Sequence, residues 1–133
     1  MSEAGYLESM KACHKALEAI EAAEHDLKGN FILAAINRMY YACYYCMTAL
    51  LLTKDIYAKT HQVTRGKFSE LFIKTGVFSD DIAIHIKNTF DLRQEADYDF
   101  DADISKEIAE AMIIKTKELY ESSVTYLKSL IKQ

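Results

Sequence analysis

The sequence predicts an all-α protein, an antiparallel four-helix bundle with one additional short helix. Three observations lead to this fold class: the 133 residues include no proline and only four glycines, half are hydrophobic, and one long stretch is almost continuously apolar. Proline and glycine disfavour helices most strongly, so their scarcity favours long helices joined by few turns. The length suits one domain, which we assign to residues 1–133.

The bundle is predicted to form around residues 30–54, which read NFILAAINRMYYACYYCMTALLLTK. A helix that is apolar on all sides is buried in a protein core or in a membrane, and this stretch is long enough for either. However, it carries Asn37 and Arg38 in its first third and four tyrosines in its middle. Membrane helices place tyrosines at the interfaces, and an internal arginine is costly there. We therefore expect a central helix of a protein with no membrane span, capped by Asn30.

The first helix is predicted from its two ends. Ser2 is a favourable N-cap, the helix is expected to run to Lys28, and Gly29 is a typical C-terminal stop. The short link to the central helix requires the two helices to be antiparallel. The expected contact face of this first helix is a narrow apolar seam of six residues, Tyr6, Met10, Cys13, Leu17, Ile20 and Leu27.

Three more helices complete the prediction. A third helix is expected over about residues 60–75 and is stopped by Gly76, after which Ser79 and two aspartates mark a new helix start. This fourth helix continues into residues 93–98, RQEADY, and an acidic turn follows. The last helix is expected to begin near Asp103 and to continue to the C-terminus with one broad apolar face.

Composition limits the classes of function. A net charge of −4 argues against a protein coated with positive charge for nonspecific nucleic-acid binding. Three cysteines do not make a disulfide framework, and the N-terminal segment MSEAGYLESMK lacks the apolar core of a secretory signal. A reducing cytoplasm is the expected location.

Two metal-site patterns occur and neither is complete. Cys43 and Cys46 have the CxxC spacing, but a structural zinc site needs two further ligands that the sequence does not offer. The alternating aspartates of residues 97–103 resemble half of a calcium loop, yet Ala102 and Ile108 occupy the positions of the required glycine and glutamate. We expect no metal and no cofactor.

The remaining candidates are polar residues on the two helices expected to meet in the core. Asn37, Arg38 and Tyr41 belong to the central helix, and Arg93 and Asp97 stand four residues apart on the fourth. Arginines near a core need carboxylates or the phosphates of a ligand. One interpretation is therefore an internal ion pair of Arg38 or Arg93 with Glu95 or Asp97. The other is a cleft that receives the phosphate of a nucleotide or RNA.

Three segments resemble a bacterial and archaeal branch of the HEPN domain family in order and spacing: NRMYYACYYCMTALL, KTHQVTRGKFSELFIKTG and RQEADYDF. With the flanking helices, the resemblance covers nearly the whole chain. It implies an all-helical bundle that commonly forms a homodimer. It also implies a nucleotidyltransferase partner in a toxin–antitoxin pair, because many members are encoded beside one. Many members are metal-independent ribonucleases.

The resemblance also suggests residue roles. Ribonuclease members use an arginine to hold the scissile phosphate and a histidine, four to six residues later, to move protons. Arg93 takes the arginine role, but Tyr98 occupies the histidine position and Phe100 the position of a tyrosine that can be adenylylated. A tyrosine, with a pKa near 10, is a poor proton shuttle at neutral pH. His61 is a substitute only if the fold brings it to Arg93.

Three functions follow as hypotheses. The first is a binding module for a nucleotide, RNA or a nucleotidyltransferase partner that lacks the usual ribonuclease histidine. The alternative is a metal-independent ribonuclease toxin that uses Arg93 with Tyr98 or His61. The third is a purely structural role for Arg93 in a buried ion-pair network.

Overall fold

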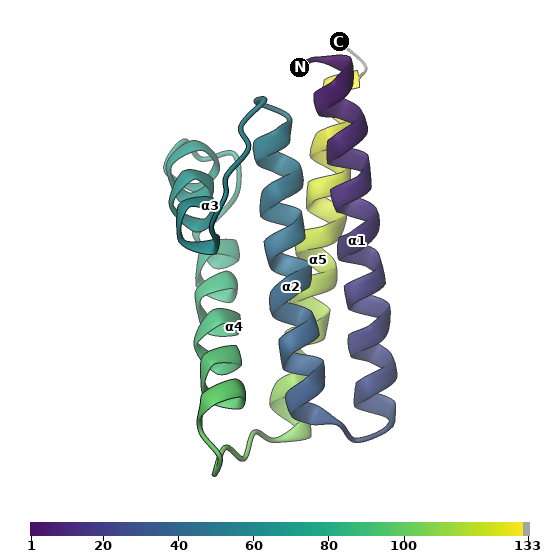
Figure 1. Ribbon diagram of the computed structural model, residues 1–133, viewed down its shortest axis with the longest axis vertical. Coiled ribbons are helices and arrows are strands. Elements are labelled where there is room, and N and C mark those ends of the chain that lie inside the picture. The colour runs from purple at the N-terminus through teal and green to yellow at the C-terminus, as the bar shows by residue number, and fades with distance from the viewer. Residues whose placement is uncertain (132–133) are drawn as a thin grey trace.

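The computed structural model describes residues 1–131, and every regular element in that range is a helix. Four of these helices are long and one is short. Figure 1 shows that the long helices lie side by side and alternate in direction, and that the short helix lies next to the start of the third long helix. The predicted antiparallel bundle with one short helix is confirmed. Its elements are α1 (Glu3–Lys28), α2 (Ile32–Leu52), α3 (His61–Phe68), the π-helical segment η1 (Ser69–Ile73), α4 (Asp80–Tyr98) and α5 (Lys106–Ile131).

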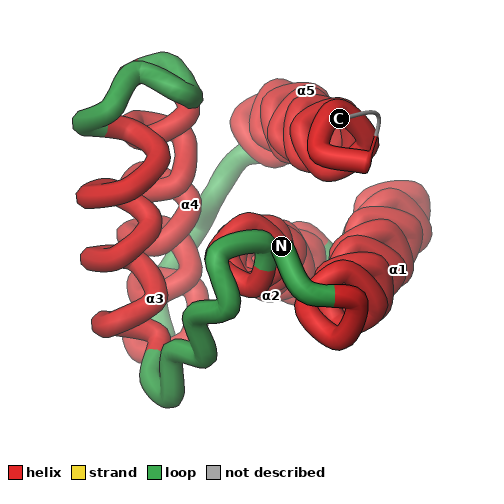
Figure 2. The backbone as a smooth tube through the Cα atoms, turned by 90° about the horizontal axis from the view of Figure 1, so that it is seen from above, coloured by secondary structure: helices red, strands yellow, loops and turns green. Residues whose placement is uncertain are grey.

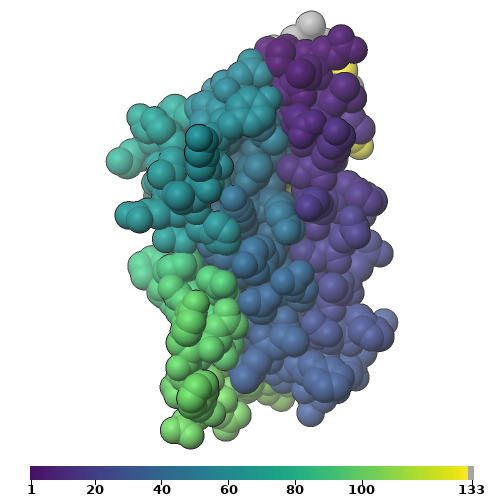
Figure 3. Space-filling view, viewed as in Figure 1, coloured from purple at the N-terminus to yellow at the C-terminus, as the bar shows by residue number. Residues whose placement is uncertain are grey.

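Helix α2 is the centre of the fold, as expected from its apolar sequence. It contacts α1, α3, α4 and α5, and the end-on view in Figure 2 shows it between α1 and the α3–α4 side. Most of its residues are buried, while Asn37, Arg38 and Tyr41 are half-buried. Figure 3 shows α2 reaching the surface between α1 and the α3–α4 side. Within residues 1–131, no helix is both long and apolar enough to cross a membrane.

The cap of α2 differs from the prediction. Asn30 lies outside the helix in the left-handed region, with φ 66°, and Phe31 takes the N-cap position without a side-chain hydrogen bond. The amide of Phe31 instead donates to the carbonyl of Asp26, at 2.8 Å, which closes the end of α1. Asparagine tolerates the left-handed conformation, so it serves here to turn the chain between two antiparallel helices.

The contact face of α1 also differs in part. Cys13, Ile20 and Leu27 are buried as expected, but Met10 is 47% exposed and Leu17 is half-buried. Small residues supply most of the buried face: Ser9, Ala12, Ala16, Ala19 and Ala23. Small side chains let two helix backbones approach closely, which explains why this face packs against α2 without large residues.

The predicted third helix over residues 60–75 consists of two segments. Thr60 caps α3 by accepting a hydrogen bond from the amide of Val63, at 3.1 Å. The helix then widens into the π-helical turn η1 and stops before Gly76, whose φ of 79° is a glycine conformation. A π-helical turn inside a helix is rare and frequently accompanies a functional site.

The last two helices begin near their predicted starts. Ser79 stands at the N-cap of α4, although its side chain makes no capping hydrogen bond. Helix α5 begins at Lys106, three residues after Asp103, because Ser105 rather than Asp103 accepts a hydrogen bond from the amide of Ile108. Residues 99–105 form the connection between α4 and α5.

Candidate functional site

All three arginines of the sequence come together around two adjacent tyrosines. The guanidinium carbon of Arg93 lies 5.0 Å from the ring centre of Tyr40 and 5.7 Å from that of Tyr41. That of Arg38 lies 5.0 Å from the ring centre of Tyr41, and Arg65 donates from Nη1 to the Tyr40 hydroxyl at 3.4 Å. We call these five residues the arginine–tyrosine cluster. It joins α2, α3 and α4, the helices that carry its arginines.

Asp97 is the carboxylate of this cluster. It lies one helical turn after Arg93, and its Oδ2 is 2.9 Å from Arg93 Nε. Arg93 Nε is buried but makes no hydrogen bond, so this contact is electrostatic and lacks hydrogen-bond geometry. Asn37 donates to the same carboxylate oxygen at 3.4 Å and accepts from Arg38 Nη2 at 2.9 Å. Asn37 therefore connects the arginine of α2 to the ion pair of α4.

His61, the first residue of α3, completes the site. Its Nδ1 lies 2.8 Å from the Tyr40 hydroxyl, and its ring stacks on Tyr44 with ring centres 4.0 Å apart. The pKa of His61 is lowered from 6.5 by burial first, and then by the positive charges of Arg93 and Arg65. Neutral imidazole is therefore the main form at pH 7. Its Nε2 has no hydrogen-bond partner among the protein atoms described.

Tyr98, which the family resemblance suggested as a partner of Arg93, lies elsewhere. Helix α4 stays regular through Tyr98, and five residues correspond to 500°, so the two side chains leave the helix in different directions. Tyr98 is 72% exposed and Phe100 is fully exposed. The structure thus brings together six of the seven candidate residues, namely Asn37, Arg38, Tyr41, His61, Arg93 and Asp97.

Two residues of the site were missed by sequence reasoning. Arg65 was not among the candidates, and Tyr40 was not separated from the other tyrosines of the central helix. One signal for Arg65 was available: it follows His61 by four residues, which places both on one side of α3. The guanidinium of Arg65 also stacks over Phe90, 3.9 Å from its ring centre.

The chemistry of the site suits an oxyanion. Guanidinium groups match phosphate with paired donors, and tyrosine faces offer stacking surfaces. Residues 1–131 include no group of three or more histidine, cysteine, aspartate or glutamate side chains that could hold a metal ion. The CxxC thiols are buried, and desolvation raises the pKa of Cys43 to about 12, so this thiol is protonated and unreactive at neutral pH.

Comparison with known proteins gives the family. The model of the HEPN domain matches residues 10–127. The protein named "Putative toxin MJ0142" of Methanocaldococcus jannaschii is 36% identical over 119 residues, which cover 90% of this chain and 81% of the relative. "Putative toxin MJ0605" of the same organism is 30% identical over 84% of this chain and 88% of its own length. A "UPF0332 protein" of Thermotoga maritima is 32% identical over 63% of this chain and 64% of its own length. The chain belongs to the HEPN domain family.

Proposed function

We propose that the protein is a toxin-type HEPN protein that binds RNA or a nucleotide through phosphate groups held by the arginine–tyrosine cluster. The observation that carries this proposal is the convergence of Arg38, Arg65 and Arg93, the only arginines of the sequence, on two tyrosine rings. Arginine is the side chain best suited to phosphate because its planar donors bind two oxygens at once. The names of two relatives support the toxin part of the proposal.

The balance of charge favours a ligand site over an internal ion-pair network. Within residues 1–131, Arg93 is the arginine that has a carboxylate within ion-pair distance. Three guanidinium groups against one carboxylate leave an excess of two positive charges, in a protein whose net charge is −4. A network that served stability alone would pair its buried charges, because unpaired charge is costly away from water. A phosphate ligand supplies the missing negative charge.

Binding of fluorescently labelled single-stranded RNA and of a nucleoside triphosphate tests this proposal. We expect Arg93→Ala to weaken binding by about tenfold or more, the effect of losing a charge-assisted hydrogen bond. Lys11→Ala is the matched control, since it removes one positive charge from an exposed position on α1. Circular dichroism verifies that both variants fold. Equal binding by wild type and Arg93→Ala would exclude the phosphate role.

A second candidate function is metal-independent RNA cleavage, which the position of His61 favours. This role needs the tautomer in which Nδ1–H donates to the Tyr40 oxygen, because Nε2 is then a free base beside the arginines. The other tautomer, in which the Tyr40 hydroxyl donates to Nδ1, places the imidazole proton on Nε2. In the first tautomer, Nε2 would take the proton of a ribose 2′-hydroxyl, whose oxygen then bonds to the adjacent phosphorus. The phosphorus–O5′ bond breaks, O5′ takes a proton from water, and the products are a 2′,3′-cyclic phosphate and a 5′-hydroxyl. Arg93 would stabilise the charge on the phosphoryl oxygens.

His61→Gln separates the two candidates. For cleavage, it should abolish product formation in the presence of EDTA while RNA still binds, whereas Arg93→Ala should impair both. If the wild-type protein leaves RNA intact in EDTA and in added Mg²⁺ over a range of pH, the ribonuclease function is excluded and the binding function stands.

Two partners belong to the same proposal. The family resemblance implies a homodimer and a nucleotidyltransferase partner. Light scattering on the purified protein measures its mass, and a mass near 15.2 kDa would contradict the dimer. The partner is tested by co-expression with a nucleotidyltransferase encoded beside the gene, followed by co-purification at moderate and high salt.

A further inference from the structure

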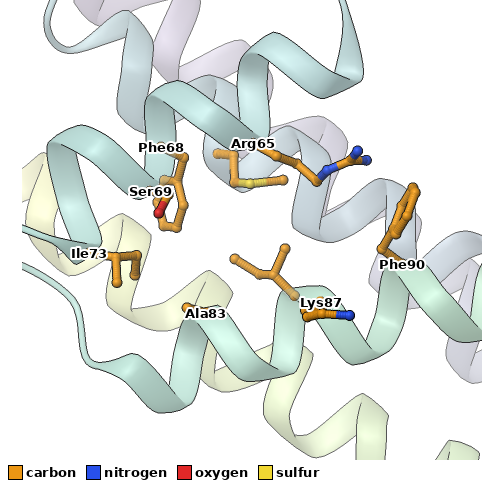
Figure 4. Close-up of a pocket in the computed structure, with 9 residues that line it drawn as sticks. Arg65, Phe68, Ser69, Ile73, Ala83, Lys87 and Phe90 are labelled. Atoms are coloured by element: carbon orange, nitrogen blue, oxygen red, sulfur yellow. The ribbon is translucent and has the colours of Figure 1, made fainter.

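A cavity lies directly beside the arginine–tyrosine cluster, with Arg65 in its wall. It has a volume of about 180 Å³ and opens between the α3–η1 side and α4 (Figure 4). Figure 4 shows Arg65, Lys87 and Phe90 at one end of the cavity and Ser69 and Ile73 at the other. The rest of the lining is apolar and comes from Met47, Phe68, Ala83 and Ile86. We call this cavity the α3–α4 pocket.

Arg65 belongs to both the pocket and the cluster. It lies in the wall of the pocket, its guanidinium stacks on Phe90 at 3.9 Å, and its Nη1 donates to Tyr40 at 3.4 Å. Lys87, the other cation of the wall, is paired with Asp91 at 2.8 Å. Arg65 is therefore the cation in the pocket wall without a carboxylate partner in residues 1–131. An anionic group bound to the cluster would lie next to the mouth of an apolar pocket.

The size and lining of the pocket suit a single planar ring. An apolar cavity of roughly 150 Å³ is sufficient for benzene, so about 180 Å³ accepts one six-membered ring, whereas a fused pair is larger. Nucleobases bind to proteins largely through their faces, by stacking on aromatic rings and on guanidinium planes. The Ser69 hydroxyl makes no hydrogen bond with the protein atoms described, so it is available to the edge of a base.

We propose that the α3–α4 pocket holds one pyrimidine base of an RNA strand. The phosphate next to this base binds to the arginine–tyrosine cluster, so the inference rests on the proposed phosphate-binding function. The ribose links the two sites, with Arg65 between them. An aromatic side chain of a protein partner would also fit the pocket by size. It carries no anionic group to match the unpaired Arg65, and this mismatch favours the nucleotide.

Competition between two RNA strands of equal length, oligouridylate and oligoadenylate, tests the pocket. We expect the wild-type protein to prefer oligouridylate by about fivefold or more, which corresponds to the roughly 1 kcal/mol at the low end of base stacking. Ala83→Leu, which adds volume to the pocket wall, should remove this preference and leave oligoadenylate binding unchanged. Free oligoadenylate stacks on itself, which lowers its affinity for the wild type and for the variant alike. The ratio of oligouridylate affinity to oligoadenylate affinity is therefore compared between the two proteins, so that this effect cancels. Ala111→Leu, on the exposed side of α5, is the matched control.

Ser69→Val is a second variant that adds volume to the pocket wall, and it replaces Ala83→Leu if that variant does not fold. Thermal unfolding shows whether each variant is folded. If the wild-type protein binds the two strands equally and Ala83→Leu changes neither affinity, the proposed binding of a base in the pocket is overturned, while the proposed phosphate binding stands. If the wild-type protein binds neither RNA strand, and Arg93→Ala therefore changes nothing, the proposed phosphate-binding function is overturned instead. If Ala83→Leu lowers binding of benzene, a single apolar ring that fits the cavity, but not of RNA, the pocket receives an apolar group other than a base and the proposal is overturned.

Discussion

The hydroxyl of Tyr40 lies 2.8 Å from Nδ1 of His61, so the interior of α2 is joined directly to the first residue of α3. Tyr40 is fully buried and cannot turn away from this contact without losing its packing. Because Arg65 follows His61 by one helical turn, the same contact also positions Arg65 against the Tyr40 hydroxyl, at 3.4 Å. One tyrosine thus positions both side chains that the short helix contributes to the candidate site, His61 and Arg65.

Tyr40→Phe tests this arrangement. The ring packing is kept, but the hydroxyl that contacts His61 and Arg65 is lost, so we expect RNA affinity to fall by roughly two- to tenfold, the range for one or two hydrogen bonds. Tyr44→Phe is the matched control because the Tyr44 ring stacks on His61 while its hydroxyl makes no hydrogen bond within residues 1–131. Fluorescence anisotropy measures both. Equal losses in the two variants would show that the hydroxyl of Tyr40 has no special role.

The pH dependence of binding provides a second prediction. Burial and two arginines lower the pKa of His61 from 6.5, so the imidazole is neutral at pH 7 and gains a proton only as the pH falls through this depressed pKa. The added positive charge lies in the proposed phosphate site, so affinity for oligouridylate should rise as the pH is lowered below 6.5 at constant ionic strength. His61→Gln should remove this slope. An unchanged slope in the variant would assign it to other groups.

The sequence predicted those parts of the site that depend on one helix and missed those that depend on how helices meet. Asn37, Arg38 and Tyr41 stand out because they interrupt an apolar stretch, and Arg93 with Asp97 because they are one turn apart. Arg65 reaches the site because the chain turns back between α2 and α3. The spacing of residues within a helix does not predict the direction of such a turn.

The fold shows the same division. The order, length and direction of the helices followed from apolar spacing and the scarcity of proline and glycine. The packing of α1 on α2 did not, because it uses small residues such as Ala16 and Ala19, whose hydrophobic signal is weak in sequence. The conformation of Asn30 depends on a left-handed turn that asparagine permits but does not require.

His85 predicts how stability changes with pH. It is buried, and its Nε2–H donates to the Thr116 hydroxyl at 2.9 Å, since that hydroxyl itself donates to the carbonyl of Met112. Burial, followed by the charge of Lys115, lowers its pKa from 6.5 to about 4. Between pH 6.5 and pH 4, His85 is therefore protonated in the unfolded chain but neutral in the folded protein. The free energy of unfolding should fall by roughly 3 kcal/mol as the pH drops from 6.5 to 4.

Urea denaturation at several pH values measures this effect. His85→Gln keeps an N–H donor for Thr116 but does not titrate, so the variant should lose less stability than the wild type over the same pH range. Its stability at pH 7 is the control for packing damage. Identical pH dependence in both proteins would show that carboxylates, and not His85, cause the loss.

Replacing either of two glycines, Gly66 or Gly5, by alanine should change the stability of the protein in opposite directions. A Cβ added at Gly66, within α3, meets no atom within 4 Å, so Gly66→Ala should stabilise the protein by about 0.5–1 kcal/mol through a better helix propensity. At Gly5, in the first turn of α1, an added Cβ would lie 2.9 Å from the carbonyl oxygen of Leu52 and 2.6 Å from Asp55 Oδ1. The backbone of α2 cannot yield easily, so Gly5→Ala should cost about 1–3 kcal/mol. Thermal unfolding should therefore move the two melting temperatures in opposite directions, and a loss of stability in Gly66→Ala would mean that α3 needs glycine for a reason other than space.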